Sequence, residues 1–363
     1  MARKILANTL CKIHFDSAAN HINSKALKKL KHIFNSIIWT LVGVYVLLTV
    51  LVHLSPVQHF LGSQVSSVLA DKFDTKVTVG SVNLGFFNRI IIDDVMMYDQ
   101  KGDSMIYASR ISAKVSLLPL LNQKISIASA QLFGLKANLY QQTPQSKHNF
   151  QFVLDSLASK DTTKHTPLDL HIGSLIIRHG AVKYDKRYIA SKSGVFSPAH
   201  ISISDLSTHI IANHITDDAI NLHIKKLAFH DKSGLQLNSL SFKLDANKRE
   251  ASLKEFELQL PHSDITLGDI HATYRFDNGK LVMPTLQYSG SIEQSKITLS
   301  DIACLLPIFR HFEDAVFFET QFTGTSTSLR CQKINFKTGS GSINLQAKGR
   351  ISDWNSRPAW DVD

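Results

Sequence analysis

From residue 75 onward, apolar and polar residues alternate with a period of two over nearly 290 residues. Clear examples are 77–84, 111–117, 220–229 and 235–244, and turns containing Gly or Asp separate such segments. This period places apolar side chains on one face of a β-strand and polar side chains on the other. The recurrence of a strand and turn every roughly 10–15 residues is typical of a sandwich, a barrel or an elongated sheet. Because no clear linker divides the region, we favour one elongated antiparallel sheet over residues 75–363.

Three features interrupt the strand pattern. Residues 150–157 have helical spacing, and residues 301–312 do too, although Pro307 is expected to break the second helix. The Asp-Asn-Gly sequence at 277–279 predicts a hairpin between flanking apolar strands.

An uncharged apolar run at 37–52 precedes the strands, within an apolar segment at 33–54. A helix of about 20 apolar residues crosses the hydrocarbon layer of a membrane, and Trp39 near one end suits the interface. A buried core helix and a cleaved signal peptide are the alternatives. The run is longer and more uniformly apolar than most buried core helices. A cleaved signal peptide is disfavoured because the segment before the run is long and no A-x-A cleavage site follows it, so we favour an uncleaved signal anchor. An apolar stripe then predicts a short amphipathic helix over 55–74.

The positive charge of the chain is concentrated before this anchor. The formal charge is +10, and residues 1–36 hold seven Lys or Arg against one acid. Lys28, Lys29 and Lys31 flank the apolar run, whereas no Lys or Arg follows it until Lys72. The positive-inside rule therefore predicts a cytoplasmic tail over 1–36, with the bulk of the chain across the membrane. A nucleic-acid partner is disfavoured, because the basic tail lacks interleaved aromatic residues and adjoins a membrane span.

The sequence holds no recognisable catalytic, cofactor or zinc motif, so we expect no enzyme, no cofactor and no metal site. Cys304 and Cys331 lie beyond the anchor, where a disulfide is chemically allowed, but nothing in the sequence brings them together. The best metal candidates have a spacing that fits neither a helix face nor a zinc pattern, and solvated strand and loop residues are the simpler interpretation. They are His209, His214, Asp217, Asp218 and His223.

Several segments together resemble a known family. KVTVGSVNLGFFNRIIIDDV at 76–95 and YDQKGD at 98–103 resemble the N-terminal region of AsmA/TamB-type bacterial envelope proteins. LLPLL at 117–121, followed by KISIASAQLFGLKANLY at 124–140, resembles the same region, and FQFVLDSL at 150–157 is similar to an element of the Bacteroidetes members. The resemblance covers about residues 37–185 and is diffuse beyond them.

The resemblance implies an inner-membrane protein with one span, a cytoplasmic N-terminus and a periplasmic bulk. It implies a sheet curled into a long apolar groove, the β-taco, that carries phospholipid or another acyl-chain cargo. It also implies an outer-membrane β-barrel as a partner, if the chain belongs to the TamB branch. The AsmA and TamB branches are not distinguished. Because 360–363 reads as the start of another strand, we expect the chain to be part of a longer one.

Alternation alone predicts which side chains line such a groove, although the same pattern also fits the core of a closed β domain. A scaffolding envelope protein with a closed core and a membrane-tethered enzyme therefore remain alternatives. The predicted lining residues are Val77, Val79, Val82, Leu84, Ile125, Ile127, Leu132, Leu135, Leu222, Ile224, Leu237 and Leu258.

Overall fold

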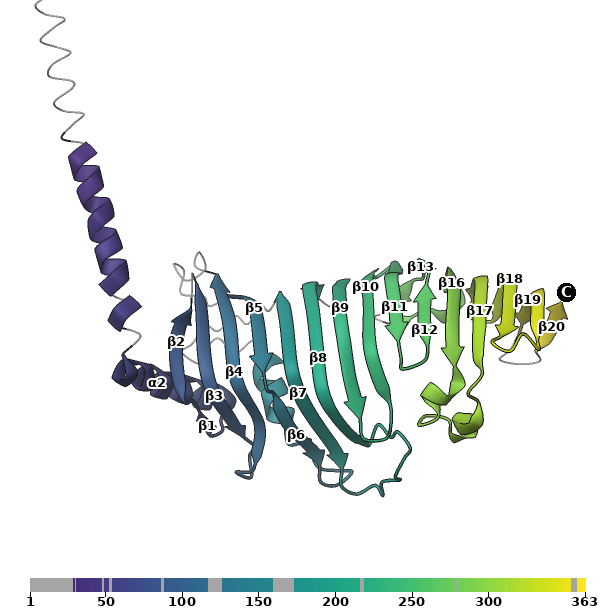
Figure 1. Cartoon of the computed structure of the whole chain (residues 1–363), viewed down its shortest axis with the longest axis horizontal. Coiled ribbons are helices and arrows are strands. Elements are labelled where there is room, and N and C mark those ends of the chain that lie inside the picture. The colour runs from purple at the N-terminus through teal and green to yellow at the C-terminus, as the bar shows by residue number, and fades with distance from the viewer. Residues whose placement is uncertain are drawn as a thin grey trace, which may run out of the picture. The chain divides into compact units, whose positions relative to one another are not determined.

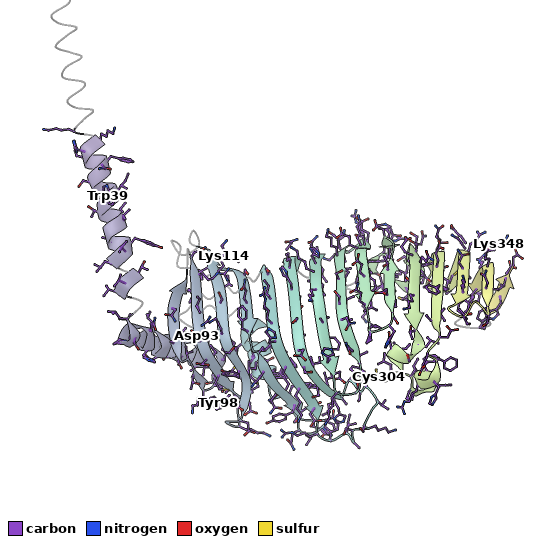
Figure 2. The ribbon with its side chains drawn as sticks, in the orientation of Figure 1. Trp39, Asp93, Tyr98, Lys114, Cys304 and Lys348 are labelled. Carbon is purple, nitrogen blue, oxygen red and sulfur yellow. The ribbon has the colours of Figure 1, made fainter. Side chains whose placement is uncertain are left out.

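A computed structural model describes residues 29, 31–47, 49–51, 54–85, 88–116, 126–158, 173–215, 219–277, 280–353 and 358–363. The chain divides into two compact units, Met1–Gln58 and His59–Asp363. The first contains the 21-residue helix Lys31–Leu51, whose most apolar 18-residue stretch has a mean hydropathy of 2.0 and is not buried. Its side chains project outward, Trp39 among them (Figure 2). By length and composition, this helix is able to cross a membrane.

The second unit is mainly β and is built around an 18-stranded sheet (Figure 1). A small hairpin, β14 and β15, forms a separate sheet. The strands are β1 Val77–Thr78, β2 Ser81–Gly85, β3 Arg89–Tyr98, β4 Ser104–Ser116, β5 Ser126–Phe133, β6 Lys136–Gln141, β7 Ser174–Lys186, β8 His200–Ile215, β9 Ala219–Asp231, β10 Gln236–Asn247, β11 Glu250–Gln259, β12 Asp264–Leu267, β13 Ile270–Thr273, β14 Phe276–Asp277, β15 Lys280–Leu281, β16 Gln287–Thr298, β17 Ala315–Thr325, β18 Ser328–Thr338, β19 Asn344–Ser352 and β20 Ala359–Val362.

Neighbouring strands follow each other along the chain, so the sheet grows in sequence order from β1 and β2 to β20 (Figure 1). The long sheet and its regular strands confirm the elongated β architecture that the period of two predicts. The hairpin predicted around 277–279 is confirmed by the antiparallel pairing of β14 and β15, although residues 278–279 lie outside the described ones.

The expectation of a purely antiparallel sheet is wrong at one place. Both β5 and β6 pair with β7 in parallel. A parallel pair needs a crossover connection of a dozen or more residues, often with a helix. The segment between β6 and β7 is of that length and contains α4, Gln151–Ala158, which is the helix predicted at 150–157.

Several strands bend near their middle, at residues in the left-handed region of backbone space. Asp94 in β3, His179 in β7 and Asp205 in β8 have φ of 52°, 54° and 53°, and Gly134 between β5 and β6 has φ of 59°. These positions form a row: Ser109 of β4 stands opposite Asp94, and a Cβ on Gly134 would lie 2.6 Å from the Ser109 Oγ. Register shifts continue through β9–β11 and β16–β19. Such irregularities bend strands, and β3 to β8 curve accordingly (Figure 1).

Besides α4, helix α2 and three short 3-10 turns accompany the sheet in the described part of the chain. Helix α2, Ser55–Phe73, covers the expected range 55–74 and approaches the β1–β2 connection, where a Cβ on Gly62 would lie 3.4 Å from the Gly80 carbonyl oxygen. Phe60 and Val68 of its predicted apolar stripe are exposed, so the stripe does not pack as one face. The expected helix at 301–312 is instead two 3-10 turns, η2 Leu299–Ile302 and η3 Pro307–His311; a third, η1, is Met283–Thr285. Pro307 begins η3, as its ring allows at a helix start and forbids inside one.

The buried core lies at the N-terminal end of this unit. Ten of the twelve apolar side chains that are buried among the described residues belong to residues 73–140. Only Leu237 and Cys304 are buried farther along the chain. Most of the sheet is therefore a single layer whose apolar side chains remain partly exposed.

Candidate functional site: an apolar face of the sheet

A continuous row of apolar side chains crosses ten strands, from β2 to β12. Directly paired residues of neighbouring strands point to the same face, so pairwise register traces the row from strand to strand. Only one member is polar, Thr208, and its Oγ1 donates to the Lys226 carbonyl oxygen at 3.1 Å. The row consists of Val82, Ile92, Ile111, Leu132, Ile177, Thr208, Leu227, Leu240, Leu258 and Ile265.

A second row runs beside it on the same face, two residues along most strands. Its two parts meet where Phe242 stacks on Phe256, with ring centroids 6.3 Å apart, across the register shift between β10 and β11. The first part is Ile90, Ala113, Ala130, Leu175, Ile210, Ile224 and Phe242, and the second is Phe256, Leu267, Ile292, Thr320, Ile334 and Ala347. We call these two rows the apolar face.

Larger side chains of the apolar face are only half-buried, although they lie in the interior of a wide sheet. Leu227, Leu240, Leu258, Ile210 and Ile224 all keep intermediate exposure. The described part of the chain places no second sheet over them, since its only other sheet is the β14–β15 hairpin. An apolar surface of this extent, unpartnered by protein, is a mark of an interaction site.

The opposite face of the same strands is polar. From β4 onward, two rows that alternate with those of the apolar face contain twelve residues, of which Ile176 and Ile211 are apolar; in β3, Ile91 pairs with Ser112 and is apolar too. Lys114, labelled near the end of β4 in Figure 2, pairs with Ser129 in one of these rows. The polar face is Ser112, Gln131, Ile176, His209 and Lys226 in one row, and Lys114, Ser129, Ser174, Ile211, His223, Lys243 and Lys254 in the other.

Exposed ion pairs link neighbouring strands outside the apolar face. The Lys243 Nζ lies 2.5 Å from Glu255 Oε1, and the Lys333 Nζ lies 2.8 Å from Glu319 Oε1. Hydrogen bonds from these lysines hold the pKa of each glutamate below its ordinary value. Pairs this exposed contribute little to stability, so they orient neighbouring side chains more than they stabilise the sheet.

The predicted lining residues divide into two groups. Val82, Leu132 and Leu258 belong to the first apolar row and Ile224 to the second. Leu222 is paired with Leu244 two residues from Ile224, and Ile127 is paired with Val115. For Leu84 only the backbone is described, and it pairs with Ile90; Ile125 lies outside the described residues.

Besides Leu222 and Ile127, which belong to neither row, four more predicted lining residues lie off the apolar face. Val77 of β1 pairs with Met97 of β3. Leu237 of β10 is buried and pairs with Phe229 of β9. Val79 and Leu135 lie in the connections between β1 and β2 and between β5 and β6. At Val79 and Leu135 the apolar–polar alternation of the sequence continues beyond the ends of β1 and β5, so the pattern does not reveal that the strand has ended.

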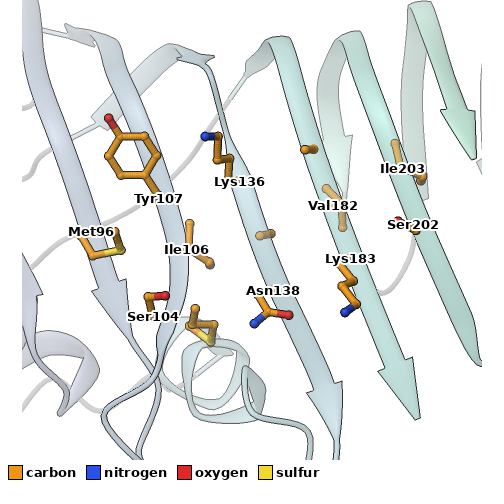
Figure 3. A pocket seen from close by; sticks show the side chains of 13 residues that line it. Met96, Ser104, Ile106, Tyr107, Lys136, Asn138, Val182, Lys183, Ser202 and Ile203 are labelled. Atoms are coloured by element: carbon orange, nitrogen blue, oxygen red, sulfur yellow. The ribbon is translucent and has the colours of Figure 1, made fainter. Parts of the chain in front are cut away.

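A cavity of about 580 Å³ lies on the other side of the row of bends (Figure 3). A third row of paired apolar residues contributes to its lining: Ile106, Ala137, Val182 and Ile203, from β4, β6, β7 and β8. The parallel pairing of β6 and β7 brings Ala137 and Val182 together here, which no local pattern predicts.

An aspartate turn ties the strand ends together near this cavity. Asp99, only 3% exposed, accepts hydrogen bonds at Oδ1 from the Lys101 and Asp103 amides and at Oδ2 from the Tyr140 hydroxyl at 2.8 Å. Burial raises the pKa of Asp99, but the hydrogen bonds from Tyr140 and the turn outweigh it, and the net pKa is lowered. Burial and the Asp99 carboxylate raise the pKa of Tyr140.

The histidines considered for a metal lie on the polar face among lysines. Burial, and then the charge of nearby lysines, lowers the pKa of both His209 and His223. Residues 216–218, and with them Asp217 and Asp218, lie outside the described ones, as does the side chain of His214. The described residues contain no group of His, Cys, Asp and Glu that could hold a metal ion. Cys304 and Cys331 are both free thiols.

Two threonines belong to the apolar face although they were not among the predicted lining residues, because the prediction considered only apolar residue types. Thr208 and Thr320 are 6% and 4% exposed within the rows of the apolar face, and the Thr320 Oγ1 has no hydrogen-bond partner. Strict alternation of neighbouring apolar residues is the signal that locates them. No family model, curated protein or solved structure matches this chain, so its function has to be argued from this geometry.

Proposed function

We propose that this protein is a membrane-anchored carrier of acyl chains, in which lipid tails lie along the apolar face. The single observation that supports the proposal most is the continuity of that face. The two parts of its second row, joined by the stacking of Phe242 on Phe256, extend from β3 to β19, with the larger side chains half-buried.

Acyl chains suit this surface for a physical reason. Removing apolar surface from water is favourable by about 25 cal/mol per Å², and a lipid tail supplies the missing layer without any directional polar contact. The row of bends supports a groove, because strands that bend along one line turn their two halves toward each other. The alternative of a closed β core is weaker, since the described residues supply no second layer.

The anchor and the proposed cargo fit one cellular setting. The helix Lys31–Leu51 would hold the chain in the inner membrane with the preceding basic residues in the cytoplasm, and the sheet would extend into the periplasm. This is the arrangement of AsmA/TamB-type proteins, and lipid transfer toward the outer membrane, or assistance of protein assembly there, is the corresponding role. An outer-membrane barrel partner belongs to the same proposal.

A pair of substitutions in β9 tests the carrier function. Ile224→Asp places a charge on the apolar face, while His223→Asp places the same charge on the polar face one residue away. The full chain is purified in detergent, and the phospholipid bound per chain is measured by mass spectrometry. We expect Ile224→Asp to reduce bound phospholipid at least twofold and His223→Asp to leave it unchanged. Equal lipid content in both variants would contradict the proposal.

A further inference from the structure

A second cavity, of about 510 Å³, lies at the end of the sheet where the β7–β8 connection meets the β9–β10 turn. Three segments contribute to it: the ends of β7 and β8, residues 191–197 of the connection, and the turn at 231–233. The connection is held in place by the Phe196 amide, which donates to the Cys304 carbonyl oxygen at 2.8 Å. This cavity plays no part in the apolar face.

Two carboxylates build the frame of the cavity and are already engaged. Asp185 Oδ1 lies 2.6 Å from His200 Nδ1. Asp231, 7% exposed, accepts from the Ser202 amide at 2.8 Å and from the Ser233 amide at 2.9 Å. These contacts fix the cavity wall and engage Asp185 Oδ1 and both carboxylate oxygens of Asp231.

Two buried polar atoms in this cavity lack any partner. Among the described residues, three buried side-chain polar atoms make no hydrogen bond, and two of them, His200 Nε2 and Ser233 Oγ, belong to residues that line it. Buried polar groups are nearly always satisfied, so such atoms call for a ligand, an ion or an ordered water. Because Nδ1 faces the Asp185 carboxylate, Nε2 is left as an acceptor in the neutral ring and as a donor in the charged one.

Lysines indicate the charge of the ligand. Lys183, Lys192 and Lys232 line the cavity from three different segments, and none of them forms an ion pair with any described residue. An anion with several acceptor oxygens can meet lysines from three directions, whereas a carboxylate offers only two oxygens. The hydroxyl of a phosphate monoester can donate to a neutral Nε2, and the Nε2 of a charged His200 donates to an oxygen of either a monoester or a lipid phosphodiester.

We propose that this cavity is a phosphate-binding site, which takes either a phosphate monoester or the phosphate of a lipid head group. Ser233 Oγ and the three lysines donate to phosphate oxygens, and His200 Nε2 contacts the remaining one. The site does not depend on the carrier function proposed above, because it uses different residues.

Calorimetric titration of the full chain in detergent tests the site with three probes: inorganic phosphate, glycerol 3-phosphate and a short-chain phosphatidylglycerol. The variants are Lys232→Ala and Ser233→Ala, with Lys280→Ala, exposed in β15, as the control. We expect saturable binding that each cavity variant weakens roughly tenfold, the size of one charge-assisted hydrogen bond, and that the control leaves unchanged. Ser233 Oγ makes no hydrogen bond, so Ser233→Ala should keep the melting temperature of the parent.

The three probes separate the two sources of phosphate. If inorganic phosphate and glycerol 3-phosphate bind but phosphatidylglycerol does not, the ligand is a soluble phosphate compound. If phosphatidylglycerol alone binds, the ligand is a lipid head group. If no probe binds, or if Lys232→Ala and Ser233→Ala bind as well as the parent, the proposal is wrong and water satisfies the two buried atoms.

Discussion

Strand β10 offers a direct comparison between the core and the apolar face. Leu237 is 7% exposed, whereas Leu240, three residues later, is half-buried on the apolar face. Truncation of either leucine to Ala removes three carbon groups, each worth about 0.8 kcal/mol when fully buried. At Leu237 the loss also leaves a cavity, so we expect a cost of about 3 kcal/mol.

At Leu240 the same truncation should cost much less. Roughly half of the transfer term applies because the side chain is only partly removed from water, and no enclosed cavity forms on an open face, so we expect about 1 kcal/mol. Urea unfolding of the full chain in detergent, followed by far-UV circular dichroism, measures both costs. If Leu240→Ala destabilises as much as Leu237→Ala, then another layer covers the face in solution and the reasoning is wrong.

Three further predictions concern the sheet and its turns. Because the pKa of Asp99 is lowered in the folded state, its contribution to stability is present above pH of about 4 and is lost as pH falls; Asp99→Asn should flatten the acid limb of a stability–pH curve. Gly134→Ala should cost about 2 kcal/mol or more in urea unfolding, since a Cβ there meets Ser109 Oγ at 2.6 Å and φ is positive; Gly134→Ala combined with Ser109→Gly should recover part of it. Lys243→Met should leave the urea midpoint of unfolding close to that of the parent, because its pair with Glu255 is exposed.

The alternation of the sequence predicts the sheet well because a period of two is a local property. Leu132 and Leu258 are 126 positions apart in the chain, yet register places them in one row through β7 to β10. That shared row is not visible in the sequence, since it depends on how many residues each turn and bulge contains. Leu135 shows the limit of the pattern: it keeps the alternation but lies beyond Phe133, where β5 ends.

The parallel pairs and the second cavity were missed for a related reason. Whether β7 lies parallel or antiparallel to β5 depends on the path of the chain between β6 and β7, and alternation along each strand is the same in both cases. His200 and Ser233 attract no attention in the sequence because they belong to no motif. Only the folded turn brings their unpaired atoms to one cavity.

Photocrosslinking from neighbouring positions of β11 tests the central claim most directly. A photoreactive residue replaces either Leu258, on the apolar face, or Glu257, which is exposed and paired with Ser241 and Thr266 on the opposite face. Each full-length variant is irradiated in native membranes, and lipid adducts are identified by mass spectrometry. We predict phospholipid adducts from position 258 and none from position 257. Adducts from neither position, or from both equally, would contradict the assignment of the apolar face as the lipid-binding surface.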